Sequence, residues 1–452
     1  MSLFITLLAF IFAIGVLVTI HELGHYWVAR WCNVKVLRFS VGFGHPLLIW
    51  RSGPDRTEWV IAAVPLGGYV KMADEREDEV AWTDRARAFN NKTVWQRIAI
   101  VLAGPLANFL LAMLLYWGLF VAGVPGMRPV IAQPPAHTVA GNSGYSAQDL
   151  ILKIDNQPVQ TWNEMRWILL KAAVNRATLQ VEVEDKQGVR RVLPLSLEGV
   201  EADDLDQGFL KKIGLMPYRP KHNAVVGEVT EEGAASRAGI VPGDKIVEID
   251  GKKVRDWDDL IDHIRTQPER TFTLVLQRND RVLQFSVTAD RVMEKGVAVG
   301  RIGIRPSTVN MERFYTTVRM GPLEAAGEAV IKVWDMSVFS LRMMGKMITG
   351  QLSWKNMSGA ITIADYAGQS AQLGWIPYVT FLALVSVSLG VLNLLPVPVL
   401  DGGRLMYYIV EIFKGRPISD QAMEIGHRIG LTLLIGLSAL AFYNDISRLL
   451  IG

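Results

Sequence analysis

The sequence predicts a multi-pass α-helical membrane protein with four spans and two small α+β domains inserted between the second and third spans. Three observations lead to this fold class. Half of the 452 residues are hydrophobic, and the mean hydropathy is positive, at +0.22. Four apolar stretches approach or exceed the length that a bilayer requires. The long segment between the second and third stretches repeats itself, which indicates two copies of one domain.

The predicted spans are four stretches without a charged residue: Leu3–Ile20, Ile98–Val124, Ile376–Leu395 and Ile429–Tyr443. They belong to two expected membrane parts, residues 1–124 and 376–452. The first three can cross a hydrocarbon core of about 30 Å, whereas the fourth is short and would need anchors such as Arg428 and Arg448. The first stretch could instead be a cleaved signal peptide. We expect a span, because no basic segment precedes it and no small-x-small cleavage site follows it.

Lysine and arginine residues predict the orientation of the spans. Many lie between the first two spans, and the segment between the last two carries Arg404, Lys414 and Arg416. Because basic loops stay in the cytoplasm, we expect both loops there and both chain termini on the opposite side. The middle segment, about residues 125–375, would lie on the same side as the termini.

The overall charge and the cysteine content say little about partners. The formal net charge is +3 without any run of basic residues, so we predict no nucleic-acid partner. Cys32 is the only cysteine in the sequence, which excludes an internal disulfide and fits any compartment. The lipid bilayer is the partner that the composition does predict.

The middle segment contains two similar stretches, "DLILKIDNQPVQTW" from Asp149 and "DKIVEIDGKKVRDW" from Asp244, offset by 95 residues without a gap. The second copy extends upstream as "GAASRAGIVPGDKIVEIDGKKV", Gly233–Val254. This stretch resembles the PDZ domain in its circularly permuted bacterial form. The resemblance implies that an extended peptide can bind at the edge of a sheet.

The two copies differ at one turn. The first has Ala-Gln at residues 147–148 where the second has Pro-Gly at residues 242–243. The resemblance therefore implies the fold for both copies and leaves peptide binding by the first copy open. Either copy could also be an inert spacer. We predict a first PDZ-like domain over residues 125–220 and a second PDZ domain over residues 221–310.

Residues 311–375 are expected to form amphipathic helices. After Pro322, charged and apolar residues are interleaved at helical spacing, as in Glu328, Val330 and Lys332. This pattern is too charged to span a bilayer and is typical of helices that lie in the membrane interface. Packing of the apolar face against the inserted domains is an equally ordinary interpretation.

The first span runs into the most informative motif, "HELGH", His21–His25. Two histidines at i and i+4 lie on one face of a helix, and Glu22 beside the first can reach a water held there. Two neutral imidazoles and a carboxylate suit Zn²⁺ with an open fourth position. The motif thus predicts a zinc site with Glu22 as general base. A structural histidine pair is the alternative, disfavoured because polar groups at membrane depth are costly.

Two histidines need a third ligand, and "NLLPVPVLDGG", Asn393–Gly403, offers Asp401. Pro396 and Pro398 interrupt the third span just before it. They free backbone groups at membrane depth, which is tolerated only where protein or a watery cavity receives them. The remaining histidines are poorer candidates, because none follows HELGH closely. Considered alone, Asp401 would more simply be a helix N-cap, and its pairing with HELGH favours the role of ligand.

Together, HELGH in the first span, "AGPLANF" in the second and "NLLPVPVLDGG" in the third resemble the site-2 protease family of intramembrane zinc proteases. The resemblance covers essentially the whole chain. It implies that His21, His25 and Asp401 bind zinc and that Glu22 is the catalytic base. It also implies that Asn393 helps to hold the substrate backbone. Relatives commonly have histidine after LDGG, where this chain has Arg404.

The basic loop contains "TEWVIAAVPLGGYVKM", Thr57–Met72, which predicts a strand, a turn and a second strand. Within the family this region is a membrane-dipping hairpin. An edge strand near the zinc could pair with a substrate and extend it, exposing carbonyl groups that a helix shields. We therefore expect Gly67, Gly68 and Tyr69 to contact the substrate. A purely structural hairpin is the alternative.

The resemblance implies a zinc endopeptidase of the bacterial inner membrane that cuts single-pass membrane proteins. Its active site would face the cytoplasm, and its termini and PDZ domains would be periplasmic. An anti-sigma factor shortened by a first protease, and remnant signal peptides, would be its substrates in regulated proteolysis of the envelope stress response. One alternative is a proteolytically inactive, membrane-anchored PDZ adaptor, which the complete set of site residues disfavours. The other is a transporter, which the lack of inverted repeats disfavours.

Overall fold

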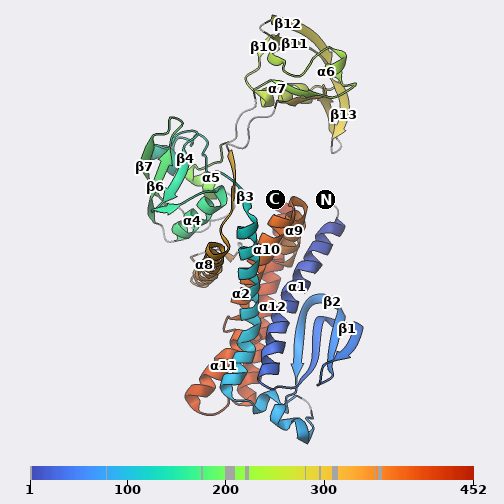
Figure 1. Ribbon diagram of the computed structural model, residues 1–452, viewed down its shortest axis with the longest axis vertical. Helices are drawn as coiled ribbons and strands as arrows, with labels where there is room; N and C mark the ends of the chain where they lie inside the picture. Colours follow the sequence, from blue (N-terminus) through green and yellow to red (C-terminus); the bar gives the residue numbers. More distant parts are fainter. Residues whose placement is uncertain are drawn as a thin grey trace. The chain divides into compact units, whose positions relative to one another are not determined.

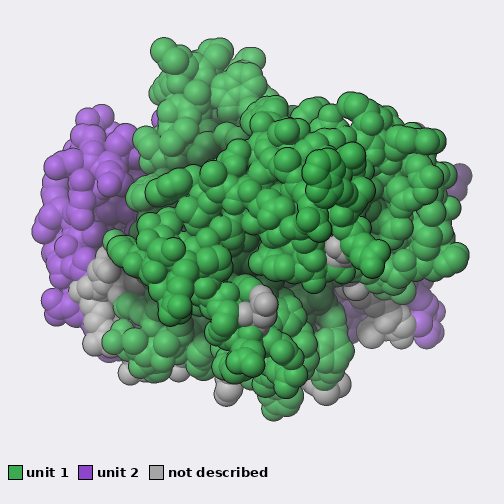
Figure 2. All heavy atoms as spheres, turned by 90° about the horizontal axis from the view of Figure 1, so that it is seen from below, with its two compact units in different colours: residues 1–125, 201–206, 317–452 green, residues 126–200, 207–316 purple. Residues whose placement is uncertain are grey.

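The computed structural model describes residues 3–77, 79–174, 177–198, 209–218, 223–279, 281–294, 297–307, 314–351, 353–354 and 359–451. The chain divides into two compact units (Figure 2). Unit 1 contains residues 1–125, 201–206 and 317–452, and unit 2 contains residues 126–200 and 207–316. Each unit is described by itself.

Unit 1 is mainly helical (Figure 1). Its helices are α1 Leu3–Trp31, α2 Val94–Ala122, α8 Pro322–Ile348, α9 Ala360–Leu373, α10 Trp375–Asn393, α11 Asp401–Lys414 and α12 Asp420–Ile451. Four helices of the described chain are long and apolar enough to cross a membrane: α1, α2, α10 and residues 421–447 of α12. By length and composition, this confirms the four predicted spans. The fourth helix, α12, is longer than the predicted uncharged stretch Ile429–Tyr443, because segments that contain polar residues extend it at both ends.

Helix α2 packs against α1, α8, α10 and α11. It begins with a capping box, in which Thr93 and Gln96 each accept a hydrogen bond from the other's backbone N–H. Gly24 of α1 brings the two backbones close, since a Cβ there would lie 2.3 Å from the carbonyl oxygen of Ala103. Small residues allow such close helix contacts in membranes. The backbones of α1 and α2 therefore approach closely at the HELGH motif.

Two long strands, β1 Val36–Ser52 and β2 Thr57–Met72, form a sheet beside α1 (Figure 1). Residues 38–41 of β1 pair with residues 58–61 and also with residues 68–71 of β2. The outer bounds of the prediction are confirmed, since β2 begins at Thr57 and ends at Met72, but the predicted turn is wrong because the strand is continuous. Its two halves still pair with different edges of β1, and Gly67, with a φ of +155°, lies between them.

Aromatic side chains hold this sheet against α1. The ring centroid of Tyr26 in α1 lies 5.9 Å from that of Phe39 in β1 and 5.1 Å from that of Trp59 in β2. All three rings belong to or pack against one buried cluster. Aromatic pairs at such distances add to the free energy of burial. The sheet is therefore fixed beside the turn of α1 that follows HELGH.

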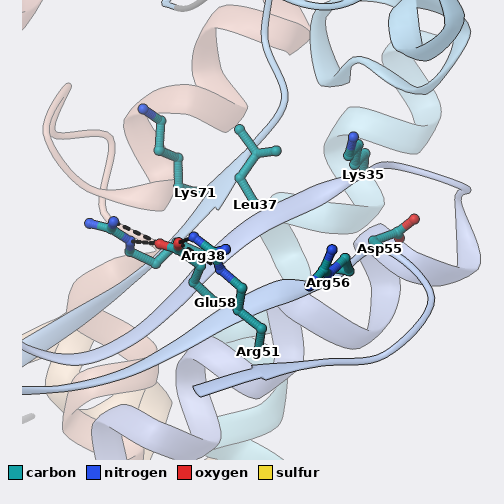
Figure 3. A pocket seen from close by; sticks show the side chains of 8 residues that line it. All are labelled: Lys35, Leu37, Arg38, Arg51, Asp55, Arg56, Glu58 and Lys71. Carbon is teal, nitrogen blue, oxygen red and sulfur yellow. Dashed lines mark hydrogen bonds and ion pairs between the residues drawn. The ribbon is translucent and has the colours of Figure 1, made fainter. Parts of the chain in front are cut away.

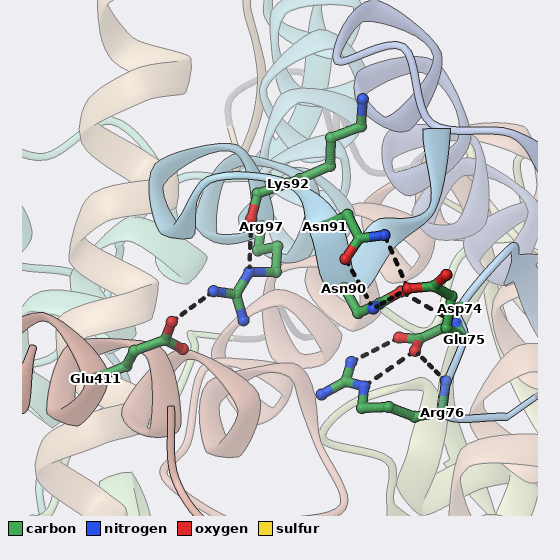
Figure 4. Close-up of polar contacts among 8 residues, drawn as sticks. All are labelled: Asp74, Glu75, Arg76, Asn90, Asn91, Lys92, Arg97 and Glu411. Atoms are coloured by element: carbon green, nitrogen blue, oxygen red, sulfur yellow. Dashed lines mark hydrogen bonds and ion pairs between the residues drawn. The ribbon is translucent and has the colours of Figure 1, made fainter. Parts of the chain in front are cut away.

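Two short 3₁₀ helices, η1 Trp82–Arg87 and η2 Phe89–Asn91, lead from the sheet to α2. Just after them, Arg97 donates to Glu411 of α11 at 2.6 Å, and its side chain and that of Glu411 are only 9% and 14% exposed (Figure 4). The guanidinium of Arg97 also lies 4.8 Å from the ring centroid of Tyr408. This ion pair ties α11 to the beginning of α2.

Helix α9 is joined to α12 by a buried carboxylate. Asp445 is 1% exposed and accepts hydrogen bonds from the backbone N–H groups of Gly359, Ile361 and Thr362 at 2.9–3.1 Å. These N–H groups belong to the first turn of α9, which has no side-chain cap of its own. Asp445 is thus an N-cap supplied by another helix.

Helix α8 has the predicted amphipathic character. Ala325, Ala329, Val333 and Met336 are buried at helical spacing, while Trp334 is 69% exposed. The buried face packs against α2 and α10 of the same unit. A position in the membrane interface stays a prediction.

The strands and short helices of unit 2 form two similar sets. The first set is α3 Val139–Asn142, β4 Leu150–Ile154, β5 Gln157–Pro158, α4 Trp162–Val174, β6 Thr178–Glu184, β7 Arg190–Ser196 and α5 Phe209–Ile213. The second is β8 Val226–Val229, α6 Ala234–Arg237, β9 Lys245–Ile249, β10 Lys252–Lys253, α7 Trp257–Arg265, β11 Thr271–Arg278, β12 Arg281–Thr288, β13 Asp290–Glu294, β14 Val297–Arg301 and β15 Ile304–Pro306. Two further strands, β3 Val124–Met127 and β16 Tyr315–Val318, pair where the chain passes between the units.

The two sets share one strand order. The first sheet has the order β5-β4-β6-β7 and the second the order β10-β9-β11-β12, which match strand for strand in chain order. The aspartate just before β4 and the one just before β9 also make the same hydrogen bond, to a backbone N–H three residues earlier. Asp149 accepts from the backbone N–H of Ser146 at 2.8 Å, and Asp244 accepts from that of Val241 at 2.9 Å. The sequence repeat is therefore a repeat of structure.

Candidate metal centre

The three predicted ligand side chains lie together. His21 and His25 are one turn apart on α1, and their Nε2 atoms are 3.2 Å apart. Oδ2 of Asp401, the first residue of α11, lies 3.2 Å from Nε2 of His21 and 3.4 Å from Nε2 of His25. Within the described chain, only this group of histidine and acidic side chains is close enough to hold a metal ion.

The three atoms fit a zinc ion. Tetrahedral zinc with bonds of about 2.0–2.1 Å places neighbouring ligand atoms about 3.3–3.4 Å apart, and the three observed separations are 3.2–3.4 Å. Oδ2 of Asp401 is also buried, and no donor among the described residues satisfies it. A buried carboxylate oxygen in that state is costly unless it binds a cation.

A hydrogen bond fixes the tautomer of His25. Its Nδ1 lies 2.8 Å from the carbonyl oxygen of Ile100 in α2, which can only accept. Nδ1 therefore carries the proton, and Nε2 keeps the lone pair that a metal needs. Helix α1 thus supplies the histidine ligand, and α2 holds it in the tautomer that can bind a metal.

Gly104 of α2 makes room for both imidazoles. A Cβ at this position would lie 2.3 Å from Nε2 of His25 and 2.8 Å from Cε1 of His21. Any side chain there would push the rings away from their present positions. The rings therefore rest directly on the backbone of α2.

The segment after α10 determines where Asp401 lies. Leu400 is the N-cap of α11, and Asp401 follows as the first helical residue, so Asp401 is not the N-cap that its sequence context alone favoured. A Cβ at Gly402 would lie 2.2 Å from the carbonyl oxygen of Leu395, and one at Gly403 would lie 2.3 Å from that of Val397. The two glycines let α11 begin directly against the turn that ends α10.

The predicted base and one predicted substrate residue are neighbours. Glu22 is 9% exposed on α1, beside His21. A Cβ at Gly68 of β2 would lie 3.1 Å from Cγ of Glu22 and 2.9 Å from Cγ1 of Val18. The strand therefore touches α1 at the glutamate, and only glycine permits this approach.

Two of the other predicted substrate residues lie against Phe43 of β1. Tyr69 stacks on Phe43 with ring centroids 6.2 Å apart, and a Cβ at Gly67 would meet the same Phe43 ring. Asn393 is the half-buried last residue of α10. In the described chain no hydrogen bond joins Gly67, Tyr69 or Asn393 to His21, His25 or Asp401, so their contact with substrate stays a prediction.

Sequence reasoning overlooked two residues of α2. Gly104 and Asn108 both touch the histidines, Asn108 through its amide nitrogen, 3.3 Å from Nδ1 of His21. They are four residues apart in the "AGPLANF" motif and so lie on one face of the helix. The sequence signal that could have identified them is a small residue followed four positions later by an amide in an apolar helix.

Comparison with known proteins agrees with this geometry. Residues 9–437 match the family described as Peptidase family M50. The chain belongs to this family, that of the site-2 proteases. It is 42% identical to the regulator of sigma E protease of Salmonella typhi, with 99% of this chain and 100% of the relative covered. It is 40% identical to the regulator of sigma-E protease RseP of Escherichia coli strain K12, with 98% of each chain covered.

A further relative, from Neisseria meningitidis, has a name that refers to a zinc metalloprotease and is 42% identical, with 98% of this chain and 99% of the relative covered. As a member of family M50, the chain is a zinc metalloprotease. Among solved structures, a PDZ domain of an SdrC-like protein from Listeria innocua matches with 26% identity, covering 20% of this chain and 97% of that one. The TM-score of this match is 0.17.

Proposed function

We propose that this M50 peptidase is an intramembrane zinc endopeptidase that cleaves single-pass membrane proteins. His21, His25 and Asp401 would hold the zinc ion, and Glu22 would be the general base. The observation that carries the proposal is the triangle of three ligand atoms at 3.2–3.4 Å. Two of these atoms belong to α1, which is apolar enough to span a membrane, and the third belongs to the first residue of α11.

Each residue has a separate task in hydrolysis. When bound, zinc lowers the pKa of water and stabilises negative charge on oxygen. Glu22 takes a proton from the attacking water and later gives it to the leaving amine. Ile100 holds the proton on Nδ1 of His25, so that this ring stays a ligand throughout. Burial of the site keeps bulk water away, which strengthens all of these interactions.

The sheet gives a substrate a place beside Glu22. Residues 68–71 of β2 pair with β1 along one edge, and no strand of the described chain pairs with their other edge. Because Gly68 touches Glu22, a substrate strand added along this edge would pass the base. Pairing would also pull a helical substrate into extended form, which frees its carbonyl groups for attack. Gly67, Tyr69 and Asn393 would complete this substrate track.

The relatives suggest the biological setting. Two of them are named regulators of sigma-E protease, so we place this chain in regulated intramembrane proteolysis of the envelope stress response. Its substrates would be an anti-sigma factor after a first cleavage and remnant signal peptides. It would lie in the bacterial inner membrane with its termini and two PDZ domains in the periplasm and its site toward the cytoplasm.

The test is cleavage of a tagged, externally truncated single-pass substrate by the purified full chain in detergent. Glu22→Gln should bind zinc in stoichiometric amount and lose cleavage, and a zinc chelator should inactivate the wild type. Glu424→Gln makes the same change on an exposed carboxylate of α12 and should cleave normally. Bound zinc without cleavage by the wild type would favour the PDZ adaptor, and absence of bound zinc would refute the metal site.

A further inference from the structure

Asn108 is a completely buried polar residue next to a predicted zinc ligand. Its exposed fraction is 0%, and its amide nitrogen lies 3.3 Å from Nδ1 of His21. The other end of the amide, Oδ1, is buried and accepts no hydrogen bond from the described residues. No hydrogen bond to Oδ1 therefore holds the amide in this orientation.

The zinc site decides which end of the amide must face His21. If the amide N–H donates to Nδ1, the proton of the imidazole must sit on Nε2, which then has no lone pair for a metal. A half-turn about the Cβ–Cγ bond exchanges the two ends of the amide. Oδ1 of Asn108 then accepts from Nδ1–H of His21, and Nε2 is free to face Asp401 at its present 3.2 Å.

One face of α2 would then prepare both histidines. The carbonyl of Ile100 accepts from Nδ1 of His25, the backbone at Gly104 supports both rings, and the amide of Asn108 faces Nδ1 of His21. These three residues are spaced at i, i+4 and i+8, one above another on the helix.

We propose that Asn108 is a positioning residue that accepts a hydrogen bond from Nδ1–H of His21 and so presents Nε2 of His21 to zinc. This inference rests on the proposed metal site. Hydrogen-bond partners of this kind orient metal-bound histidines, and their loss typically weakens metal binding about 10- to 100-fold.

The test compares three variants of the full chain by competition for zinc with a chromophoric chelator in detergent. Asn108→Leu removes the acceptor and should weaken zinc binding about 10- to 100-fold. Asn108→Asp keeps an acceptor and lacks a donor, so it should bind zinc at least as tightly as the wild type. Ser386→Ala is the matched control, because the Ser386 hydroxyl donates to the backbone carbonyl of Asn108 at 2.7 Å and leaves its side chain alone.

Ser386→Ala should lower the unfolding temperature without changing zinc affinity. Zinc affinity of Asn108→Asp as low as that of Asn108→Leu, with both variants folded, would overturn the acceptor role. Wild-type affinity in Asn108→Leu would overturn any positioning role. Both results leave the metal site itself intact, whereas a wild type that binds no zinc would refute the proposed function and this inference together.

A second, independent observation is a basic cavity of about 410 Å³ on the sheet (Figure 3). Five basic side chains line it: Lys35, Arg38, Arg51, Arg56 and Lys71. Only two carboxylates, Asp55 and Glu58, also line it, which leaves three more positive than negative charges. Arg51 and Arg38 both donate to Glu58, at 2.5 and 2.8 Å, and lower the pKa of its carboxyl group. One carboxylate is thus shared by two guanidinium groups.

The same two strands carry an exposed apolar surface. Leu47, Leu48, Ile49 and Trp50 of β1 are 44–68% exposed, directly before Arg51. A phosphate group attached to hydrocarbon chains complements a basic cavity on a strand that also carries such a surface, whereas free phosphate would use only the cavity. We infer that the cavity binds the phosphate headgroup of an anionic lipid.

The probes are short-chain phosphatidylglycerol, phosphatidylcholine with the same chains, and inorganic phosphate, added to the full chain in neutral detergent. Phosphatidylglycerol alone should raise the unfolding temperature. The double variant Arg56→Gln, Lys71→Gln should need about 30-fold more of it, since each basic residue contributes about a factor of five. The double variant Arg190→Gln, Arg305→Gln, at exposed sites of unit 2, should respond like the wild type.

Three results would overturn the lipid site. An equal response to phosphatidylcholine would mean that the hydrocarbon chains alone are bound. An equal response to inorganic phosphate would mean that the cavity binds the free anion. An equal loss of response in the control variant would mean that total charge is responsible, without a specific cavity.

Discussion

Replacement of Gly104 by alanine tests the arrangement of the metal centre most directly. The added Cβ would lie 2.3 Å from Nε2 and 2.6 Å from Cε1 of His25, and 2.8 Å from Cε1 of His21. Ordinary contact begins near 3.4 Å, so the His25 ring must move by about 1 Å or the helices must separate. The ring cannot retreat freely, because its Nδ1 is bonded to Ile100.

A displacement of about 1 Å at a reacting group can cost about 100-fold in rate, which is about 2.7 kcal/mol of transition-state stabilisation. We expect Gly104→Ala to lose at least this factor in kcat/KM and to bind zinc at least about tenfold more weakly. Helix stability gives no reason for a loss, because alanine favours a helix over glycine by about 1 kcal/mol.

Gly118, in the same helix, provides the control. A Cβ there would meet nothing within 4 Å, so Gly118→Ala should keep wild-type zinc affinity and cleavage. Both variants would be assayed for substrate cleavage and for zinc competition in detergent. Wild-type zinc affinity and cleavage in Gly104→Ala would show that the histidine rings do not rest on α2, and the account of the site would be refuted.

Three further predictions concern stability. Asp445→Ala should lower the unfolding temperature of unit 1 while leaving zinc affinity unchanged, because it leaves buried N–H groups of α9 without an acceptor, at about 1–3 kcal/mol for such a group. Arg97→Met should cost about 3–5 kcal/mol by leaving Glu411 buried and unpaired, and the double variant Arg97→Met, Glu411→Leu should recover most of this loss in denaturant titration. A hydrogen bond from Arg87 lowers the pKa of Asp55 below its ordinary 3.8, so its stabilising effect is present above that pH and is lost as the pH falls through the folded-state value. Asp55→Asn should therefore unfold with a flatter dependence on pH below about 4, and an unchanged slope would contradict this.

Local sequence was sufficient for much of the fold. Uncharged length predicted the four spans, and the 95-residue offset predicted two sets of strands with one order. The fourth helix and the sheet were less well predicted. Helix α12 extends through polar residues that neighbouring helices satisfy, as Asp445 shows by capping α9. The two halves of β2 pair with different edges of β1, and such a register depends on contacts that no local pattern records.

HELGH alone predicted the chemistry of this protein, because helical spacing places its two histidines on one face with a glutamate beside the first. Every α-helix has the same regular geometry, so that inference does not depend on the rest of the chain. The surroundings of the motif depend instead on how distant segments of the chain pack together. Ile100 and Asn108 lie 75 and 87 residues from the histidines that they face, and Asp401 lies far beyond the inserted domains. Those contacts arise from helix packing, in which small residues such as Gly104 set how closely two backbones approach.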